Sequence, residues 1–234
     1  MSEPQFSAPM ETVRKRKLEA TQRLLGDTIG MDEDQWRAPS LLPGWTRAHV
    51  AVHLARGADA LARIVRAAQQ GRSEALYPDP KARFNDLERG IERTGLDLQI
   101  DLDTSAGELN GILDSVTDWS LPVMIGPNRA SIAQVPMARL RELVVHHIDL
   151  ACGFTVDDID PVPARWLLQW YVSMGPTTGP RLAIESDSGV SARLGDQGEE
   201  RRVTGNDAHL WGWLTGRSGP EGLTGADDLR MPLL

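Results

Sequence analysis

Cysteine is almost missing from this chain of 234 residues, which contains only Cys152. A single thiol excludes an internal disulfide framework and any cysteine-rich zinc knuckle, and it suits a reducing compartment. Because Leu150, Ala151 and Phe154 lie close to Cys152 in the sequence, we interpret its side chain as a small buried hydrophobic group rather than a nucleophile.

Long apolar segments are missing as well. No run is long enough to span a bilayer, and residues 1–10 lack the basic start and the apolar stretch of a secretory signal. The sequence also lacks a glycine-rich phosphate loop, a dinucleotide-binding fingerprint and internal repeats. It therefore predicts a soluble, cytoplasmic protein.

Cations are fewer than anions, since Lys and Arg number 25, Asp and Glu number 33, and the net charge is -8. This balance argues against a general affinity for nucleic acid or for anionic membranes. The basic run at residues 14–17 lies in a helical pattern with Val13, Leu18 and Leu24. We therefore interpret the run as a solvated helix face.

Apolar residues recur at helical spacing through the first two thirds of the chain, and 41% hydrophobic content is enough for a core. We expect helices over residues 10–29, 46–70 and 81–95, one that opens with a capping box at Ser105 and Glu108, and one over residues 136–153, with a loop or short extended piece at 120–134. The short connections predict an antiparallel bundle.

The character of the sequence changes after residue 155. A helical pattern at residues 164–175 precedes a strand-like stretch at 181–187 and glycine-spaced, alternating residues at 191–205, and Asn206 can cap a last helix. We predict an α+β protein, in which residues 1–155 form the helix bundle and residues 156–234 form a small α+β domain.

Four of the five histidines fall into two tight groups, His49 with His53 and His146 with His147. In the stretch RELVVHHIDL, Glu142 precedes His146 by four residues, so a helix places a carboxylate and an imidazole on one face. Two histidines and one carboxylate are a common catalytic zinc set that leaves one position open. A histidine from another helix would complete such a site.

His53 is our candidate for this third ligand. It lies a turn after Val50 and a turn before Gly57 on the apolar seam of its helix, so we expect its ring to point into the bundle. His49 only borders the seam and is interpreted either as a residue that supports a ligand or as a capped group on the surface. His147 is interpreted as a core histidine with a hydrogen-bonded partner.

An ordinary solvated helix surface is the alternative interpretation of the Glu142–His146 pair. The neighbouring residues leave little of this helix that can be wet; they are Leu143, Val145 and Ile148. Asp149 either accepts an N–H from a ligand histidine or simply ends the helix surface. His209, among leucine and tryptophan residues, is interpreted as structural.

The same stretches resemble a known family. LPGWTRAHVAVHLARGADAL, the connection YPDPKARFNDLERG, and RELVVHHIDL are similar to the amino-terminal domain of the mycothiol-dependent maleylpyruvate isomerases, members of the DinB-like bundle group. By motif position, the resemblance implies a zinc ion, or another divalent metal, held by His53, Glu142 and His146. It also implies that the carboxy-terminal domain completes the substrate site, where Arg217 in LTGRSGPEGL matches a basic residue associated with substrate binding.

The reaction implied by the resemblance is a cis-trans isomerisation of maleylpyruvate to fumarylpyruvate, in gentisate degradation, through a transient adduct with mycothiol. A metal-coordinated thiol loses its proton at neutral pH, so no protein cysteine is needed. The expected partners are a small dicarboxylate and a low-molecular-weight thiol, without nucleic acid or membrane, and the chain is expected to be a monomer. Arg217 pairs with a substrate carboxylate or, alternatively, caps the carbonyls that end the preceding helix.

Two other functions stay open at this point. A mycothiol S-transferase would use the same thiolate on another electrophile and would consume the thiol. A non-enzymatic binding module would hold a small apolar ligand against tryptophans of the carboxy-terminal domain; these are Trp166, Trp170, Trp211 and Trp213.

Overall fold

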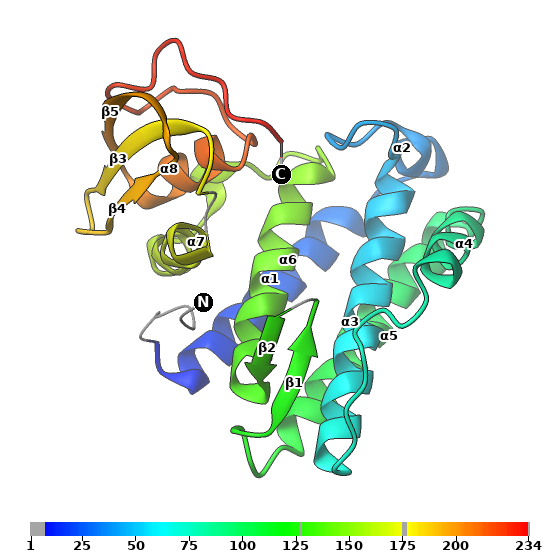
Figure 1. Cartoon of the computed structure of the whole chain (residues 1–234). Helices are drawn as coiled ribbons and strands as arrows, with labels where there is room; N and C mark the ends of the chain where they lie inside the picture. Colours follow the sequence, from blue (N-terminus) through cyan, green and yellow to red (C-terminus); the bar gives the residue numbers. More distant parts are fainter. Residues whose placement is uncertain (1–7, 127, 175–176, 234) are drawn as a thin grey trace. The chain divides into compact units, whose positions relative to one another are not determined.

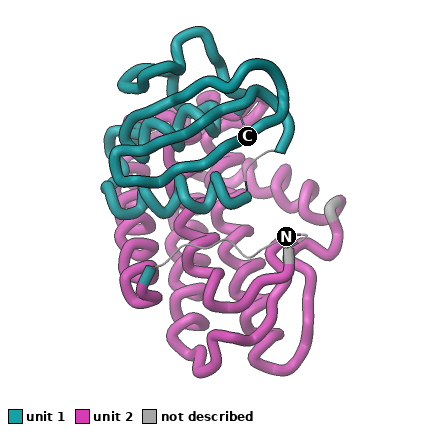
Figure 2. Tube along the Cα trace, turned by 60° about the vertical axis from the view of Figure 1, so that its left-hand side comes forward, with its two compact units in different colours: residues 1–8, 154–234 teal, residues 9–153 magenta. Residues whose placement is uncertain are grey.

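The computed structural model describes residues 8–126, 128–174 and 177–233. It confirms the α+β class, with a helical amino-terminal region and a small carboxy-terminal mixed sheet. The chain divides into two compact units (Figure 2). Residues 9–153 form one unit, and the described residues from Phe154 onward belong to the other.

The first unit is a helix bundle. Its long helices are α1 (Met10–Thr28), α3 (Arg47–Gln69), α5 (Gly95–Asp114) and α6 (Val135–Asp149). Helix α3 packs against α5 and α6, and α1 packs against the same two helices (Figure 1). The shorter elements are α2 (Glu33–Arg37), α4 (Pro80–Gly90), the antiparallel hairpin of β1 (Pro122–Ile125) and β2 (Asn128–Ser131), and the 3₁₀ turn η1 (Ile132–Gln134).

Helix α3 lies at the centre of the bundle core. Its start is set by a capping box, in which the Thr46 side chain accepts from the His49 amide and the His49 ring accepts from the Thr46 amide at 3.0 Å. Val50, Leu54 and Ile64 are at most 2% exposed. Burial of this seam decides the rotation of α3 about its axis, and therefore which of its polar residues face α6.

The helix expected to open at Ser105 was placed wrongly. Helix α5 begins at Gly95, after Thr94 accepts a hydrogen bond from the Asp97 amide, and it runs straight through Ser105. The Ser105 hydroxyl donates to the Leu102 carbonyl at 3.2 Å inside the helix. A serine–glutamate pair with capping-box spacing lies here in a helix interior, because the apolar seam continues on both sides of it.

Three other expectations also need correction. Helix α4 ends at Gly90 rather than at residue 95, and α6 ends at Asp149, before the left-handed Ala151 (φ 51°). The basic run 14–17 is not wholly solvated, since Lys17 is 4% exposed and its ammonium group donates to Asn110. Burial lowers the pKa of Lys17 to about 8.

The second unit contains a three-stranded mixed sheet and two helices. Strand β3 (Pro180–Ser186) is central, with β4 (Ser191–Leu194) antiparallel on one side and β5 (Gln197–Gly205) parallel on the other. Helix α7 (Pro161–Met174) packs against α8 (Asp207–Leu214), and η2 (Val156–Asp158) precedes them. Asn206 caps α8 by accepting from the His209 amide, as predicted.

Among the described residues, no helix is both long enough and apolar enough to cross a membrane.

Gly90, the last residue of α4, leaves no room for a side chain. A Cβ atom there would lie 2.5 Å from Cγ1 of the buried Val52. We expect Gly90→Ala to lower the free energy of unfolding by about 1–3 kcal/mol, because overpacking forces the helices apart. Gly111→Ala is the control, since nothing lies within 4 Å of that position in α5, and urea titration should show it to be neutral or slightly stabilising. Equal losses in the two variants would contradict the steric explanation.

Candidate metal centre

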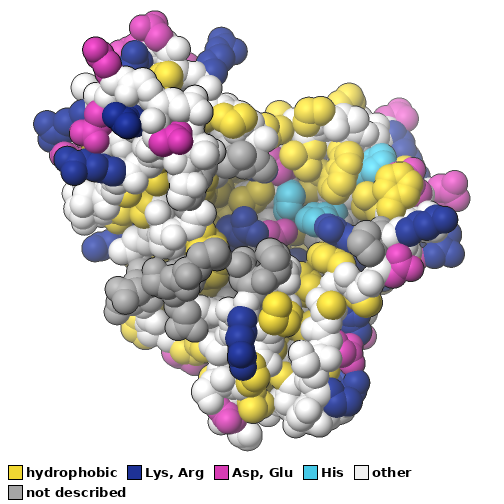
Figure 3. All heavy atoms as spheres, in the orientation of Figure 1, with side chains coloured by type: hydrophobic (Ala, Val, Ile, Leu, Met, Phe, Trp, Pro, Cys, Tyr) yellow, Lys and Arg dark blue, Asp and Glu magenta, His cyan; other side chains and the backbone are white. Residues whose placement is uncertain are grey.

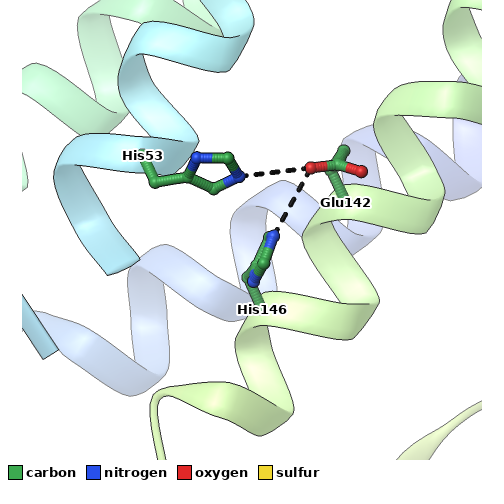
Figure 4. Close-up of side chains that lie close together, drawn as sticks. All are labelled: His53, Glu142 and His146. Atoms are coloured by element: carbon green, nitrogen blue, oxygen red, sulfur yellow. Dashed lines mark hydrogen bonds and ion pairs between the residues drawn. The ribbon is translucent and has the colours of Figure 1, made fainter. Parts of the chain in front are cut away.

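Three side chains of the ligand type meet inside the bundle. His53 projects from α3, while Glu142 and His146 project from α6 one turn apart (Figure 4). The Glu142 Oε2 atom lies 3.4 Å from Nε2 of His53 and 3.4 Å from Nε2 of His146. The structure therefore brings together the three residues chosen from the sequence, and the alternative of a solvated helix surface does not apply to Glu142 and His146.

The spacing of the three ligand atoms fits one small cation. One atom from each residue lies within 4.8 Å of the other two. A tetrahedral zinc ion with bonds of about 2.0–2.1 Å holds its ligand atoms about 3.3 Å apart, and both distances from Glu142 match this value. The side chains of His53 and His146 are 15% and 12% exposed, respectively, so the site is accessible from outside, and histidines reach the surface in Figure 3.

The electrostatics of the three groups are coupled. Burial alone would raise the pKa of Glu142, but hydrogen bonds with His146 and His53, and the Arg141 charge, hold it well below its usual value. Burial lowers the pKa of His53. The carboxylate is thus ionised and His53 is neutral at neutral pH, which are the protonation states that a divalent ion requires.

Asp149 orients His146. Its Oδ2 atom lies 2.9 Å from Nδ1 of His146, and its side chain is 0% exposed. Burial disfavours the charged form of His146, yet Asp149 and Glu142 outweigh burial and raise the pKa of this imidazole. In the neutral form of His146, the ring hydrogen is on Nδ1 and is donated to Asp149, so the Nε2 lone pair is left to bind a metal.

Replacing Asp149 with asparagine should weaken metal binding by about 10- to 100-fold, since an amide neither fixes the tautomer of His146 nor increases its basicity. Competition with a chelating dye measures this affinity. Asp27→Asn is the matched control, because Asp27 lies 3.1 Å from Nε2 of His147, a buried histidine outside the triad. An equal loss of metal affinity in Asp27→Asn would contradict the role assigned to Asp149.

Family membership follows from comparison with known proteins. A family model described as the mycothiol maleylpyruvate isomerase N-terminal domain matches residues 18–151, more than half of the chain. The chain belongs to this family. No curated protein matches it by sequence.

Solved structures agree with the fold of this isomerase-family chain. A crystal structure of a mycothiol-dependent maleylpyruvate isomerase has a TM-score of 0.85 and 24% identity, and the match covers 97% of this chain and 98% of that one. A crystal structure of a histidine-to-alanine mutant of a mycothiol-dependent maleylpyruvate isomerase matches equally well. This likeness shows the fold, a helix bundle with a small mixed sheet.

The other histidines of this family member have partners outside the triad. His49 is 9% exposed, takes part in the α3 cap and stacks on Trp45 at 5.9 Å. His147 is 2% exposed. In the carboxy-terminal unit, Nε2 of His209 lies 2.7 Å from Asp157. His147 is therefore a core residue, as predicted, whereas His49 is buried in the α3 cap rather than being a surface group. The structural interpretation of His209 stays a prediction.

Arg83 and Trp45 contact the candidate ligand His53 and were missed by the sequence interpretation. Nη2 of Arg83 lies 3.2 Å from Nδ1 of His53, and the Trp45 ring meets the same imidazole edge-on at 5.6 Å. Arg83 lies in the helix predicted over residues 81–95, but no spacing along the chain predicted its contact with His53. The start of that helix is set by Asp79, which accepts from the first free amides of α4.

Arg217 follows α8 in the carboxy-terminal unit. Its Nη1 atom donates to the Thr215 carbonyl at 3.0 Å, and its amide donates to the Gly212 carbonyl at 2.8 Å. These bonds to the end of α8 fit the capping alternative. A role in substrate binding stays a prediction of the family resemblance.

Proposed function

We propose that this chain is a metal- and mycothiol-dependent isomerase that converts maleylpyruvate to fumarylpyruvate. The observation that carries the proposal is the convergence of His53, Glu142 and His146 within a bundle of the mycothiol maleylpyruvate isomerase family. The solved relatives with this fold are structures of a mycothiol-dependent maleylpyruvate isomerase.

The donor set fits zinc or a similar divalent ion. Two neutral imidazoles and one carboxylate leave such an ion with a net positive charge and an open position. When bound, it lowers the pKa of a coordinated thiol and so supplies a thiolate at neutral pH. Cys152 packs against the bundle core, which supports a thiol that comes from outside the protein.

The residues of the chain have separate tasks in this proposal. His53, Glu142 and His146 bind the ion, and Asp149 fixes the imidazole of His146. Arg141 donates to Glu142 Oε1 at 2.6 Å, which leaves Oε2 of the same carboxylate directed at the two imidazoles.

The test combines metal analysis of the purified protein with an assay of maleylpyruvate, with and without mycothiol. We expect about one zinc or similar ion per chain, and conversion to fumarylpyruvate only when the thiol is present. Free mycothiol should be recovered in full, since an isomerase regenerates it. Stoichiometric loss of the thiol would identify an S-transferase instead, and a metal-free, inactive protein would remove both enzymes in favour of a binding module.

A further inference from the structure

A cavity of about 350 Å³ lies in the bundle unit beside α3 and the segment of residues 76–86. Its lining includes three arginines, Arg56, Arg63 and Arg83, together with Tyr77. Neither the candidate metal site nor the fold accounts for this cavity. The charges around it decide what it can bind.

Two of the arginines are already engaged. Arg56 forms ion pairs with Asp59, at 3.0 Å, and with Asp101. Arg63 donates to the Leu76 carbonyl at 2.7 Å. The Nε atoms of both are buried, and that of Arg63 lies 3.7 Å from a carboxylate oxygen of Glu74, so neither arginine offers an unpaired charge to the cavity.

The carboxylates that line the cavity are also engaged, but not with Arg83. Asp79 accepts hydrogen bonds from the amides of Lys81 and Ala82 as the α4 cap. Asp86 pairs with Arg89. Arg83 has no carboxylate within ion-pair distance among the described residues, and its charge is therefore available for an anion.

Arg83 is held in place by an aromatic ring and by a candidate metal ligand. Its guanidinium carbon lies 3.9 Å from the centre of the Tyr77 ring, and its Nη2 atom lies 3.2 Å from Nδ1 of His53. The stacking fixes the plane of the guanidinium without satisfying its N–H donors. An anion bound to Arg83 would thus lie about one imidazole away from the metal position.

The contact with His53 also couples the two sites. Nδ1 of His53 accepts from Arg83 only when the ring hydrogen is on Nε2, the atom that faces Glu142. If Nε2 of His53 held a metal, the ring hydrogen would be on Nδ1 and would face the Arg83 N–H donor. Arg83 would then no longer donate to this imidazole, and its N–H groups would be available to another acceptor.

We propose that this cavity is a carboxylate subsite, in which Arg83, backed by the Tyr77 ring, binds one carboxylate of a small dicarboxylate. The inference rests on the proposed function for the identity of that ligand as the substrate. The carboxylate accepts two N–H bonds from the planar guanidinium, which matches it in geometry and charge.

Succinate, an unreactive dicarboxylate, is the probe, and calorimetry of the full chain with and without zinc is the measurement. We expect saturable binding that zinc strengthens, and Arg83→Gln should weaken it by about tenfold or more. Arg83→Lys keeps the charge but not the paired donors, so its affinity for succinate should lie between those of the unaltered chain and Arg83→Gln. Lys81→Gln is the matched control, because Lys81 is exposed on the same helix and does not line the cavity; this variant should bind succinate as the unaltered chain does.

Equal succinate affinity in the unaltered chain and Arg83→Gln would overturn the proposal, as would the absence of saturable binding. Inorganic phosphate bound as tightly as succinate would overturn the assignment to carboxylates. Failure of the proposed function has a different signature, namely no bound zinc or no turnover while Arg83-dependent succinate binding persists. Circular dichroism of each variant checks that α4 is intact.

Discussion

His53→Ala is expected to abolish stable metal binding, and with it the thiol-dependent isomerisation. Glu142 and His146 come from the same helix one turn apart, and without His53 only these two protein ligands would remain, which is one fewer than catalytic zinc sites use. Loss of a supporting group costs about 10- to 100-fold in affinity, so loss of a ligand itself should cost more. Metal content after dialysis and a maleylpyruvate assay are the measurements.

His49→Ala is the control for this variant. His49 lies one turn before His53 on α3, and its ring caps the helix start through Thr46. We therefore expect a small loss of stability, about 1 kcal/mol, with metal content unchanged. Full zinc occupancy in His53→Ala would remove this residue from the site, and the proposed function would lose its main support.

Acidification is expected to release the metal in two stages. The pKa of His146 is raised by Asp149 and Glu142 against the effect of burial, so this imidazole competes for a proton already above its ordinary value of 6.5. The pKa of His53 is lowered by burial, so its protonation follows at lower pH. The apparent affinity should fall about tenfold per pH unit below the first pKa and about a hundredfold per pH unit below both, because each protonated imidazole must lose a proton before the metal binds.

In the metal-free chain, the contribution of His146 to folding stability should change with pH in the opposite direction to the metal affinity. A raised pKa in the folded state means that the stabilisation from His146 is fully present below 6.5 and is lost as pH rises through the folded value. Zinc titrations at a series of pH values, and urea unfolding of the metal-free chain at the same values, measure the two trends. Asp149→Asn should move the first stage to lower pH, and an unchanged profile in that variant would contradict the assignment.

Local sequence signals predicted most of the bundle because the apolar seams are regular. Thr46 and Asn206 cap the helices expected to follow them. The prediction failed where a local signal competed with a longer pattern. Ser105 and Glu108 have the spacing of a helix start, but the seam of α5 continues through them and burial of that seam outweighs one capping interaction.

Helical spacing also chose the metal residues. The four-residue step from Glu142 to His146 places both on one face of α6, and the position of His53 between Val50 and Gly57 directs its ring inward. Both relations involve residues that are close together in the chain, so they can be derived from the sequence alone. No spacing rule, however, specifies the level at which α3 meets α6, because that depends on side-chain packing across the whole core.

Sequence by itself determined the helix faces, the class of fold and the kinds of ligand atom available, since these depend on residues within a few turns of one another. Only the tertiary structure decided that His53 meets Glu142 at 3.4 Å, that Asp149 is buried beside His146, and that Arg83 reaches the same centre from α4. The contacts of His53 with Glu142 and with Arg83 each join two different helices. The burial of Asp149 depends on the rest of the core. The chain order does not encode such distances directly; they follow from how the apolar seams pack together.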